Sequence, residues 1–183
     1  MSVSQSDRDP VIMAEIINGG KELFKRYGFK KTTMEDIARA VGKSKSALYY
    51  YFKTKEEIFE AILHEDIRKH LQKVSEEMKL AGTAVEKFRV FVNGMLSNVK
   101  EKAEGYSVFR AELYESARNI LEIAEEKDRF VEHLLKDVLL FGISTGELKP
   151  MQSVEMDVWV NLVHSSLKEI GKKLFLSEKH DYF

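Results

Sequence analysis

Apolar residues recur every three or four positions along nearly the whole chain, and this spacing constrains the fold more than any other feature. No stretch alternates apolar and polar residues for long enough to indicate a β-strand. Only 2 prolines interrupt the 183 residues, so few positions oppose a helix. The spacing therefore predicts an all-α protein with about eight or nine helices.

The composition agrees with a chain that folds around an apolar core, because 44% of its residues are hydrophobic and 32% are charged. The absence of cysteine excludes disulfides, iron–sulfur clusters, thiolate zinc sites and a cysteine nucleophile. Residues 1–9 are too polar for a secretory signal, and no apolar run approaches the ~20 residues that a membrane span needs. We therefore expect a cytoplasmic protein.

Charge is distributed unevenly, although the net charge is only −1. Residues 21–55 carry ten lysines and arginines against three acidic residues, whereas residues 56–183 carry eighteen against twenty-four. Such a basic segment is typical of a surface that meets a polyanion, although a solvated basic face has the same composition. The asymmetry alone leaves both interpretations open.

The first helix has clear start and stop signals. Asp9 is a good N-cap, Pro10 suits the first helical position, and Gly28 ends the helix. The pair Gly19-Gly20 lies inside it and costs about 1 kcal/mol per glycine relative to alanine. We interpret these two glycines as positions where a neighbouring helix passes close by.

Two short helices follow and form a helix-turn-helix unit. Thr33, with Asp36 three residues later, predicts the start of a helix over 34–41. Gly42 ends that helix in a position that tolerates a left-handed backbone. Ser44 caps the next helix, which runs to about Phe52. Two short helices that are joined by a glycine turn and preceded by a longer helix are typical of DNA-binding domains.

The second short helix carries a polar face that solvation alone does not explain. Its apolar residues lie four apart and are expected to face the core. The opposite face then carries Lys45, Ser46, Tyr49 and Tyr50. A lysine can bind a phosphate or the edge of a guanine, and hydroxyl groups reach phosphate oxygens, so this face suits duplex DNA. Lys55, at the start of the next helix, adds a further cation.

Residues 10–63 resemble the DNA-binding domain of the tetracycline-repressor (TetR) family of bacterial transcription regulators. The matching stretches, in the family's order and spacing, are Leu23-Phe24, Gly28-Phe29, Thr32 to Ala38 and Ser46 to Phe59. The resemblance implies a homeodomain-like helix-turn-helix domain over residues 1–55 and a helical effector-binding and dimerisation domain over residues 56–183. The implied partners are double-stranded operator DNA, a small-molecule effector and a second copy of the chain.

The resemblance also implies roles for individual residues. It implies phosphate contacts for Thr33 and Lys55, base contacts for Lys45 and Ser46, and a backbone or base contact for Tyr49. Tyr50 occupies the neighbouring aromatic position. Lys43 departs from the family, which usually has an apolar residue there, and we expect it to add a phosphate contact.

An effector cavity among the middle helices is a further implication of the resemblance. The candidate lining residues are Phe88, Phe91, Met95, Tyr106, Phe109, Arg110, Tyr114 and Trp159. Arg110, His133 and His164 are candidates to hold a polar group of the ligand. Aromatic residues at helical spacing more often belong to a core, so a fully packed interior stays the alternative.

The last two predicted helices are more apolar than the periphery of a monomer requires. Two such helices from each subunit would form a four-helix bundle across a two-fold axis. The predicted interface residues are Leu134, Leu135, Val138, Trp159, Leu162 and Ser166.

These observations predict a homodimeric, ligand-responsive transcriptional regulator, with a repressor released by a small hydrophobic effector as the first hypothesis. The alternatives are a DNA-binding accessory protein without a ligand and a helical ligand carrier. No GxSxG, P-loop or GxGxxG motif occurs, and the histidines lack metal-binding spacing, so we expect no enzyme, cofactor or metal site. The charged run at residues 125–128 is interpreted as a solvated helix boundary.

Overall fold

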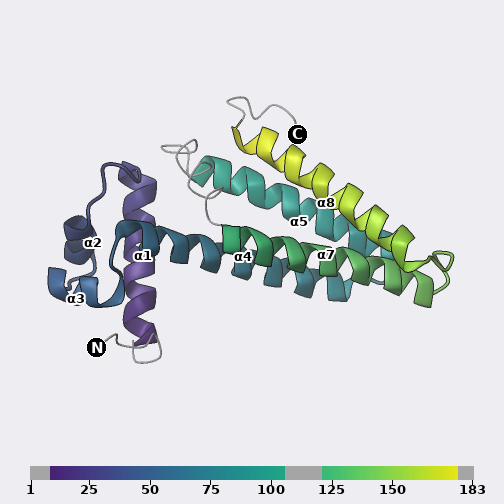
Figure 1. Cartoon of the computed structure of the whole chain (residues 1–183), viewed down its shortest axis with the longest axis horizontal. Coiled ribbons are helices and arrows are strands. Elements are labelled where there is room, and N and C mark those ends of the chain that lie inside the picture. Colours follow the sequence, from purple (N-terminus) through teal and green to yellow (C-terminus); the bar gives the residue numbers. More distant parts are fainter. Residues whose placement is uncertain (1–8, 106–120, 177–183) are drawn as a thin grey trace. The chain divides into compact units, whose positions relative to one another are not determined.

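The computed structural model describes residues 9–105 and 121–176, and within these ranges it contains helices and no strand (Figure 1). The helices are α1 (Pro10–Tyr27), α2 (Met34–Ala40), α3 (Lys45–Tyr51), α4 (Lys55–Leu80), α5 (Ala84–Gly105), α7 (Leu121–Ser144) and α8 (Ser153–Leu176). The predicted all-α class is confirmed. A further helix predicted over residues 106–117 lies outside the described residues.

The chain divides into two compact units, and the division falls inside α4 between Asp66 and Ile67. The first unit holds α1, α2, α3 and the first turns of α4. The second unit holds the rest of α4 together with α5, α7 and α8. The domain boundary that we expected after residue 55 stays a prediction; it lies at the start of α4, eleven residues before this division.

The helices of the first unit begin where their capping residues predict. The side chain of Asp9 caps α1, and Ser44 caps α3. Thr33 and Asp36 form a reciprocal capping box at the start of α2, in which each side chain accepts a hydrogen bond from the other residue's backbone N–H. Gly42 joins α2 to α3 with φ 66°, the left-handed conformation that glycine adopts without strain.

The core of the first unit is shared by all of its helices. Ile37 of α2 and Leu48 of α3 are fully buried. Phe24, Phe29 and Phe59 form an aromatic cluster with ring centroids 5.1–5.8 Å apart. The two glycines of α1 allow the close approach that we predicted. A Cβ on Gly20 would lie only 2.8 Å from Cγ2 of Ile58, so α4 could not pack there against a larger residue.

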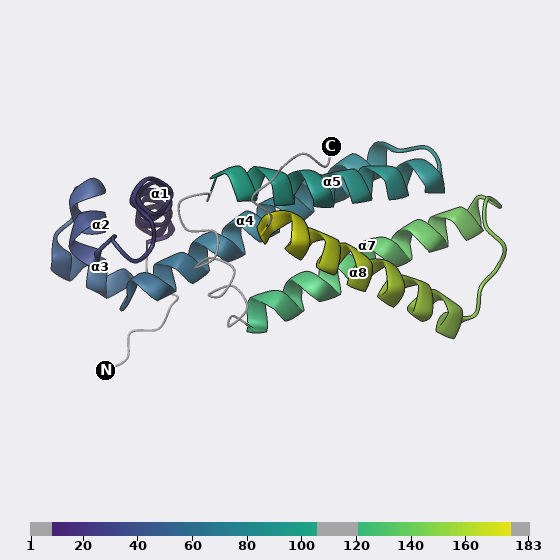
Figure 2. The same cartoon turned by 90° about the horizontal axis from the view of Figure 1, so that it is seen from above.

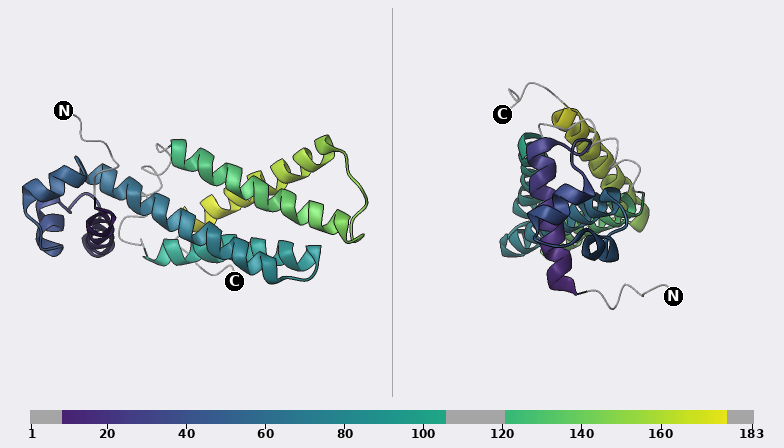
Figure 3. Two further views of the ribbon diagram at one scale, coloured as in Figure 1. Left: turned by 90° about the horizontal axis from the view of Figure 1, so that it is seen from below. Right: turned by 90° about the vertical axis from the view of Figure 1, so that its left-hand side faces the viewer.

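The second unit is built from two helical hairpins. Figure 2 and the left panel of Figure 3 show α7 and α8 running in opposite directions and joined by a loop at one end. The buried side chains of its core come from all four helical segments; they are Leu71, Val74, Met78, Ala84, Phe91, Val131, Leu134, Leu135, Val138, Leu139 and Val160.

The described residues contain neither a membrane-spanning candidate nor a metal-binding cluster. No described helix is long and apolar enough to cross a membrane. Within the same residues, no three His, Asp or Glu side chains gather closely enough to hold a metal ion.

Candidate nucleic-acid interface

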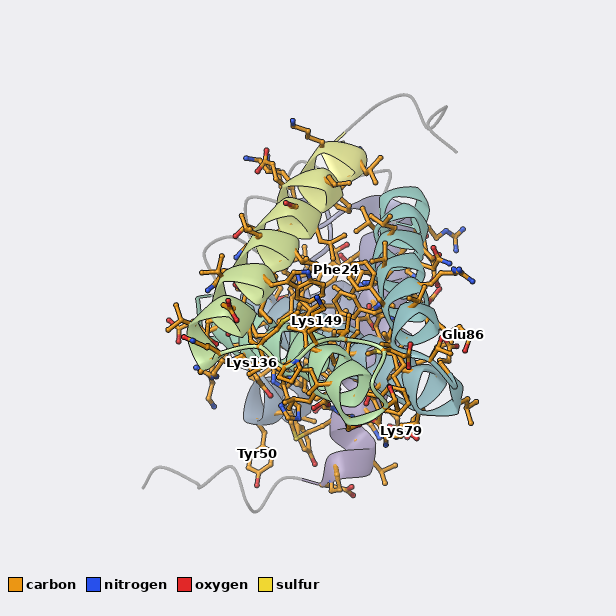
Figure 4. All side chains as sticks on the ribbon, turned by 90° about the vertical axis from the view of Figure 1, so that its right-hand side faces the viewer. Phe24, Tyr50, Lys79, Glu86, Lys136 and Lys149 are labelled. Carbon is orange, nitrogen blue, oxygen red and sulfur yellow. The ribbon has the colours of Figure 1, made fainter. Side chains whose placement is uncertain are left out.

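The polar face of α3 is presented to solvent because the opposite face is anchored in the core. Leu48 is fully buried, while Lys45, Ser46 and Tyr50 are exposed and Tyr49 is half-buried. In Figure 4 the ring of Tyr50 projects outward from its helix. The predicted orientation of α3 is confirmed, and its polar side chains are open to a ligand.

Lys45 is held by an acidic residue of the neighbouring helix. Its ammonium forms an ion pair with the carboxylate of Glu35 on α2 and lies 5.9 Å from the centre of the Tyr49 ring. The hydrogen bond from Lys45 lowers the pKa of Glu35, and the same bond raises the pKa of Lys45. Both groups are therefore charged at neutral pH. Both are also largely exposed, so another anion can reach Lys45.

Two further lysines near α3 have partners within the first unit. Nζ of Lys43 lies 3.1 Å from Oε2 of Glu15 on α1. Nζ of Lys53 donates a hydrogen bond to the backbone oxygen of Tyr49 at 2.9 Å. The basic segment is thus not simply a solvated positive surface, because the ammonium groups of Lys43, Lys45 and Lys53 are bonded to acceptors of the protein.

Lys55 has a structural position that its sequence context does not reveal. Its ammonium donates to the backbone oxygens of Phe29 at 2.9 Å, Lys30 at 3.3 Å and Thr32 at 3.2 Å. It also lies 4.5 Å from the centre of the Phe29 ring. An ammonium has three N–H donors, and these three carbonyls use all of them. A phosphate contact, which the family resemblance implies, would have to replace one of these bonds.

The hydroxyl groups of Thr33 and Ser46 are exposed but already have local partners. Oγ1 of Thr33 donates to Oδ2 of Asp36 at 2.6 Å, and this bond is the main cause that lowers the pKa of Asp36. Oγ of Ser46 lies 3.2 Å from Oγ of Ser44, the cap of α3. Both residues lie at exposed helix starts, and a bond from the Thr33 hydroxyl to a phosphate oxygen would have to replace its bond to Asp36.

Residues 16–62 match the family described as bacterial regulatory proteins, tetR family. The matched region includes the whole of α2 and α3 and the capped turns that orient their side chains. These residues form a TetR-family DNA-binding domain, and the chain that carries it is similar to TetR-family regulators. It is accordingly a DNA-binding transcriptional regulator.

Relatives of this TetR-family regulator extend beyond the matched domain. The HTH-type transcriptional regulator YfiR of Bacillus subtilis strain 168 is 29% identical over 147 residues, which cover 76% of this chain and 69% of YfiR. The fatty acid metabolism regulator protein of the same strain is 25% identical over 135 residues, which cover 74% of this chain and 70% of that protein.

Solved structures share the fold at lower sequence identity. The fatty acid degradation regulator FadR from Bacillus halodurans superposes with a TM-score of 0.65 at 22% identity and covers 92% of this chain and 85% of that chain. A TetR transcription regulator from Haloarcula marismortui ATCC 43049 has a TM-score of 0.69 at 18% identity and covers 88% and 85% of the two chains. The helical architecture of this regulator is therefore that of the family.

The described pocket candidates of the TetR-family regulator lie in the second unit. Phe91 is fully buried, and the ring of Phe88 lies 5.5 Å from that of Trp159. Met95 packs against the same core. The effector cavity stays a prediction, because its other candidates lie outside the described residues; they are Tyr106, Phe109, Arg110 and Tyr114.

Three of the predicted dimer residues require a correction. Leu134, Leu135 and Val138 are 3%, 0% and 3% exposed, because α7 turns them into the core of its own unit. A partner subunit cannot contact side chains that the chain itself already buries. Leu162 is 65% exposed and Ser166 is also exposed, so these two remain available to a partner. Trp159 is half-buried against Phe88.

The charged run at residues 125–128 is not merely solvated, contrary to our interpretation. Burial lowers the pKa of Lys127. Asp128 binds Nζ of Lys168 at 2.6 Å and Nε2 of His164 at 3.2 Å, so it ties α7 to α8. His133, the other histidine considered for a ligand, is exposed beside Asp137. The sequence carries no local signal for the two bonds of Asp128, because Lys168 and His164 lie far from it along the chain.

Proposed function

We propose that this TetR-family regulator is a homodimeric repressor that leaves its operator when a small hydrophobic effector binds the second unit. The observation that carries DNA binding is the outward face of α3, where Lys45, Ser46, Tyr49 and Tyr50 are displayed by a buried apolar anchor. A lysine and hydroxyl groups on one helix face match the acceptors that duplex DNA presents in its major groove and along its backbone.

In this proposal, α4 transmits the effect of effector binding from the second unit to the first. The first turns of α4 belong to the first unit, and the remainder belongs to the second. An effector that shifts α4 in the second unit would change the separation of the two α3 helices in a dimer. Because coupling between two ligands is reciprocal, operator DNA and effector would weaken each other's binding by the same factor.

We propose a fatty-acid-like molecule as the class of effector. Two similar proteins, one relative and one structural neighbour, are named for the regulation of fatty acid metabolism or degradation. The apolar side chains that form the interior of the second unit suit an aliphatic chain. Titration of the protein–DNA complex with a long-chain fatty acid tests this class. Release of DNA supports it, and an unchanged complex favours an accessory protein without a ligand.

A selection from random duplex DNA tests the DNA-binding function. We expect the wild-type chain to enrich an inverted repeat, since each subunit of a two-fold dimer presents one α3 helix to one half-site. Tyr49→Ala and Lys45→Ala should lose this enrichment while keeping the helical circular dichroism signal and the dimer. Lys45→Ala is the more specific test of the two variants, because the Lys45 side chain is exposed and its removal leaves no cavity. A folded wild-type dimer that enriches no sequence would contradict the proposal.

A further inference from the structure

The ion pair between Glu35 and Lys45 contributes little to holding α2 and α3 together. The two helices are already joined through buried side chains, Ile37 on α2 and Leu48 on α3. The side chain of Lys45 is 59% exposed and that of Glu35 is 47% exposed. Exposed ion pairs add little to stability, because water screens the charges and two flexible side chains lose freedom. The main effect of Glu35 is therefore on the position and charge of Lys45.

The carboxylate of Glu35 also repels DNA phosphates that approach Lys45. A group that binds the ammonium of Lys45 must approach within a few ångströms of the Glu35 carboxylate, because the two form one ion pair. A phosphate that binds the ammonium of Lys45 leaves the Glu35 carboxylate without its cation and close to the negatively charged duplex. The exchange replaces one anion by another, so the number of ion pairs does not rise.

We propose that Glu35 is a specificity-determining residue, which withholds Lys45 from the phosphates of non-matching DNA and yields it to a matching base edge. The inference rests on the DNA-binding function proposed above. Non-matching DNA is held through phosphate contacts and the counterions that they release. On such DNA, Lys45 keeps its bond to Glu35 and releases no counterion.

On matching DNA, a base edge competes with Glu35 for the ammonium of Lys45. The other contacts of α3 then fix the helix in the major groove, where N7 and O6 of a guanine offer two acceptors to one lysine. The Tyr49 ring lies 5.9 Å from Nζ of Lys45, so both side chains share the face of α3 that we propose for the groove. Glu35 therefore lowers the affinity for every sequence but lowers it most for sequences that lack the matching base.

The variant Glu35→Gln tests this proposal, because glutamine keeps the size of the side chain and removes its charge. Binding is measured over a range of salt concentrations with two probes, the unselected random duplex pool and the duplex enriched by the wild-type chain. On the random pool we expect affinity to rise about five- to tenfold per subunit near 0.1 M salt, with a salt slope steeper by about 0.9 per subunit. On the enriched duplex the gain is smaller, so the ratio of the two affinities falls.

Two controls separate this role from a general effect of charge. Glu22→Gln removes an equal charge from an exposed position on α1 and should leave both affinities near those of the wild type. In a Lys45→Gln background, Glu35→Gln should no longer steepen the salt slope, because the lysine that it releases is absent.

Each remaining outcome is decisive. Equal gains on both probes, or a steeper slope that persists without Lys45, would show general repulsion and overturn the specificity role. A wild-type chain that binds DNA and a Glu35→Gln variant with unchanged affinities and slope would overturn this inference alone. A folded wild-type chain that binds neither probe would overturn the proposed function, and this inference would fall with it.

Discussion

Lysines of the basic segment differ in function according to the acceptor that each one meets. Lys45 faces a carboxylate that another anion can replace, whereas Lys55 faces three backbone oxygens that belong to the turn before α2. The carboxylate of Glu35 lies at the surface, so another anion can replace it beside Lys45. Removing the Lys55 ammonium would break all three of these bonds. Lys45 is thus suited to bind DNA, and Lys55 is suited to fix the turn.

Replacing Lys55 by methionine tests the structural role. Methionine keeps an unbranched apolar side chain beside Phe29 but removes the three N–H donors. We expect the free energy of unfolding to fall by roughly 2 kcal/mol, because hydrogen bonds to a charged donor are stronger than neutral ones. Urea unfolding followed by circular dichroism measures the change. Lys53→Met, which removes a single exposed bond to Tyr49, is the matched control.

The salt dependence of DNA binding distinguishes the two roles of Lys55. With a structural role, the folded Lys55→Met variant keeps the slope of the wild type. A slope that is shallower by about 0.9 per subunit, with unchanged stability, would instead show the phosphate contact that the family resemblance implies.

Helices of the regulator begin at caps of two kinds. Thr33 and Ser44 cap α2 and α3 from within the local sequence, so a capping pattern predicts them. The start of α5 is also capped from a distance. Both carboxylate oxygens of Glu147, in the loop between α7 and α8, accept the backbone N–H of Ala84, at 3.1 and 2.9 Å. This contact fixes one helical hairpin of the second unit to the other.

Glu147→Ala should therefore destabilise the second unit by about 1 kcal/mol, the usual effect of losing a helix cap. The loss exposes a backbone N–H at the start of α5 and removes one acceptor of the Thr145 hydroxyl, whose Oγ1 lies 2.9 Å from Oε1 of Glu147. Thermal unfolding measures the effect, and Lys149→Gln in the same loop is the control. Equal stability of the two variants would mean that the tertiary cap is dispensable.

At the scale of the whole molecule, the described chain leaves one apolar stripe of α8 uncovered. Val154, Val158 and Leu162 are 70%, 54% and 65% exposed, and Ile170 continues the same four-residue spacing. Ser166 lies between them and would let a second helix approach closely. Rows of residues spaced by four are the ridges that pack into grooves of a neighbouring helix. This stripe is where we expect the partner subunit of the dimer.

Leu162→Glu should dissociate the dimer without unfolding the chain. The side chain is exposed within one chain, so a glutamate there costs little until a partner buries it without a counter-ion. We expect the dimer dissociation constant to rise on the order of a hundredfold, measured by sedimentation equilibrium. Binding to an inverted repeat should weaken in parallel. Leu80→Glu, at an 87% exposed position on α4, is the control, and a dimer that survives Leu162→Glu would exclude this interface.

The local sequence determined the helices, their starts and the orientation of α3. Capping residues, the turn glycine at position 42 and the apolar spacing all act within a few residues, so they can be read without knowledge of the neighbours. The family resemblance rests on the same short segment. These signals were sufficient to predict the polar face of α3 and its anchor in the core.

Only the tertiary structure decided which partners these side chains meet. The pair of Lys45 with Glu35 and the turn bonds of Lys55 join segments that no local spacing relates. The predicted dimer residues of α7 fail for a similar reason. Apolar residues lie on more than one side of α7, with Leu135 buried and Leu140 half exposed, and spacing cannot tell which side faces the core. Packing against α5 and α8 makes that choice, because it buries the side that has helices to cover it.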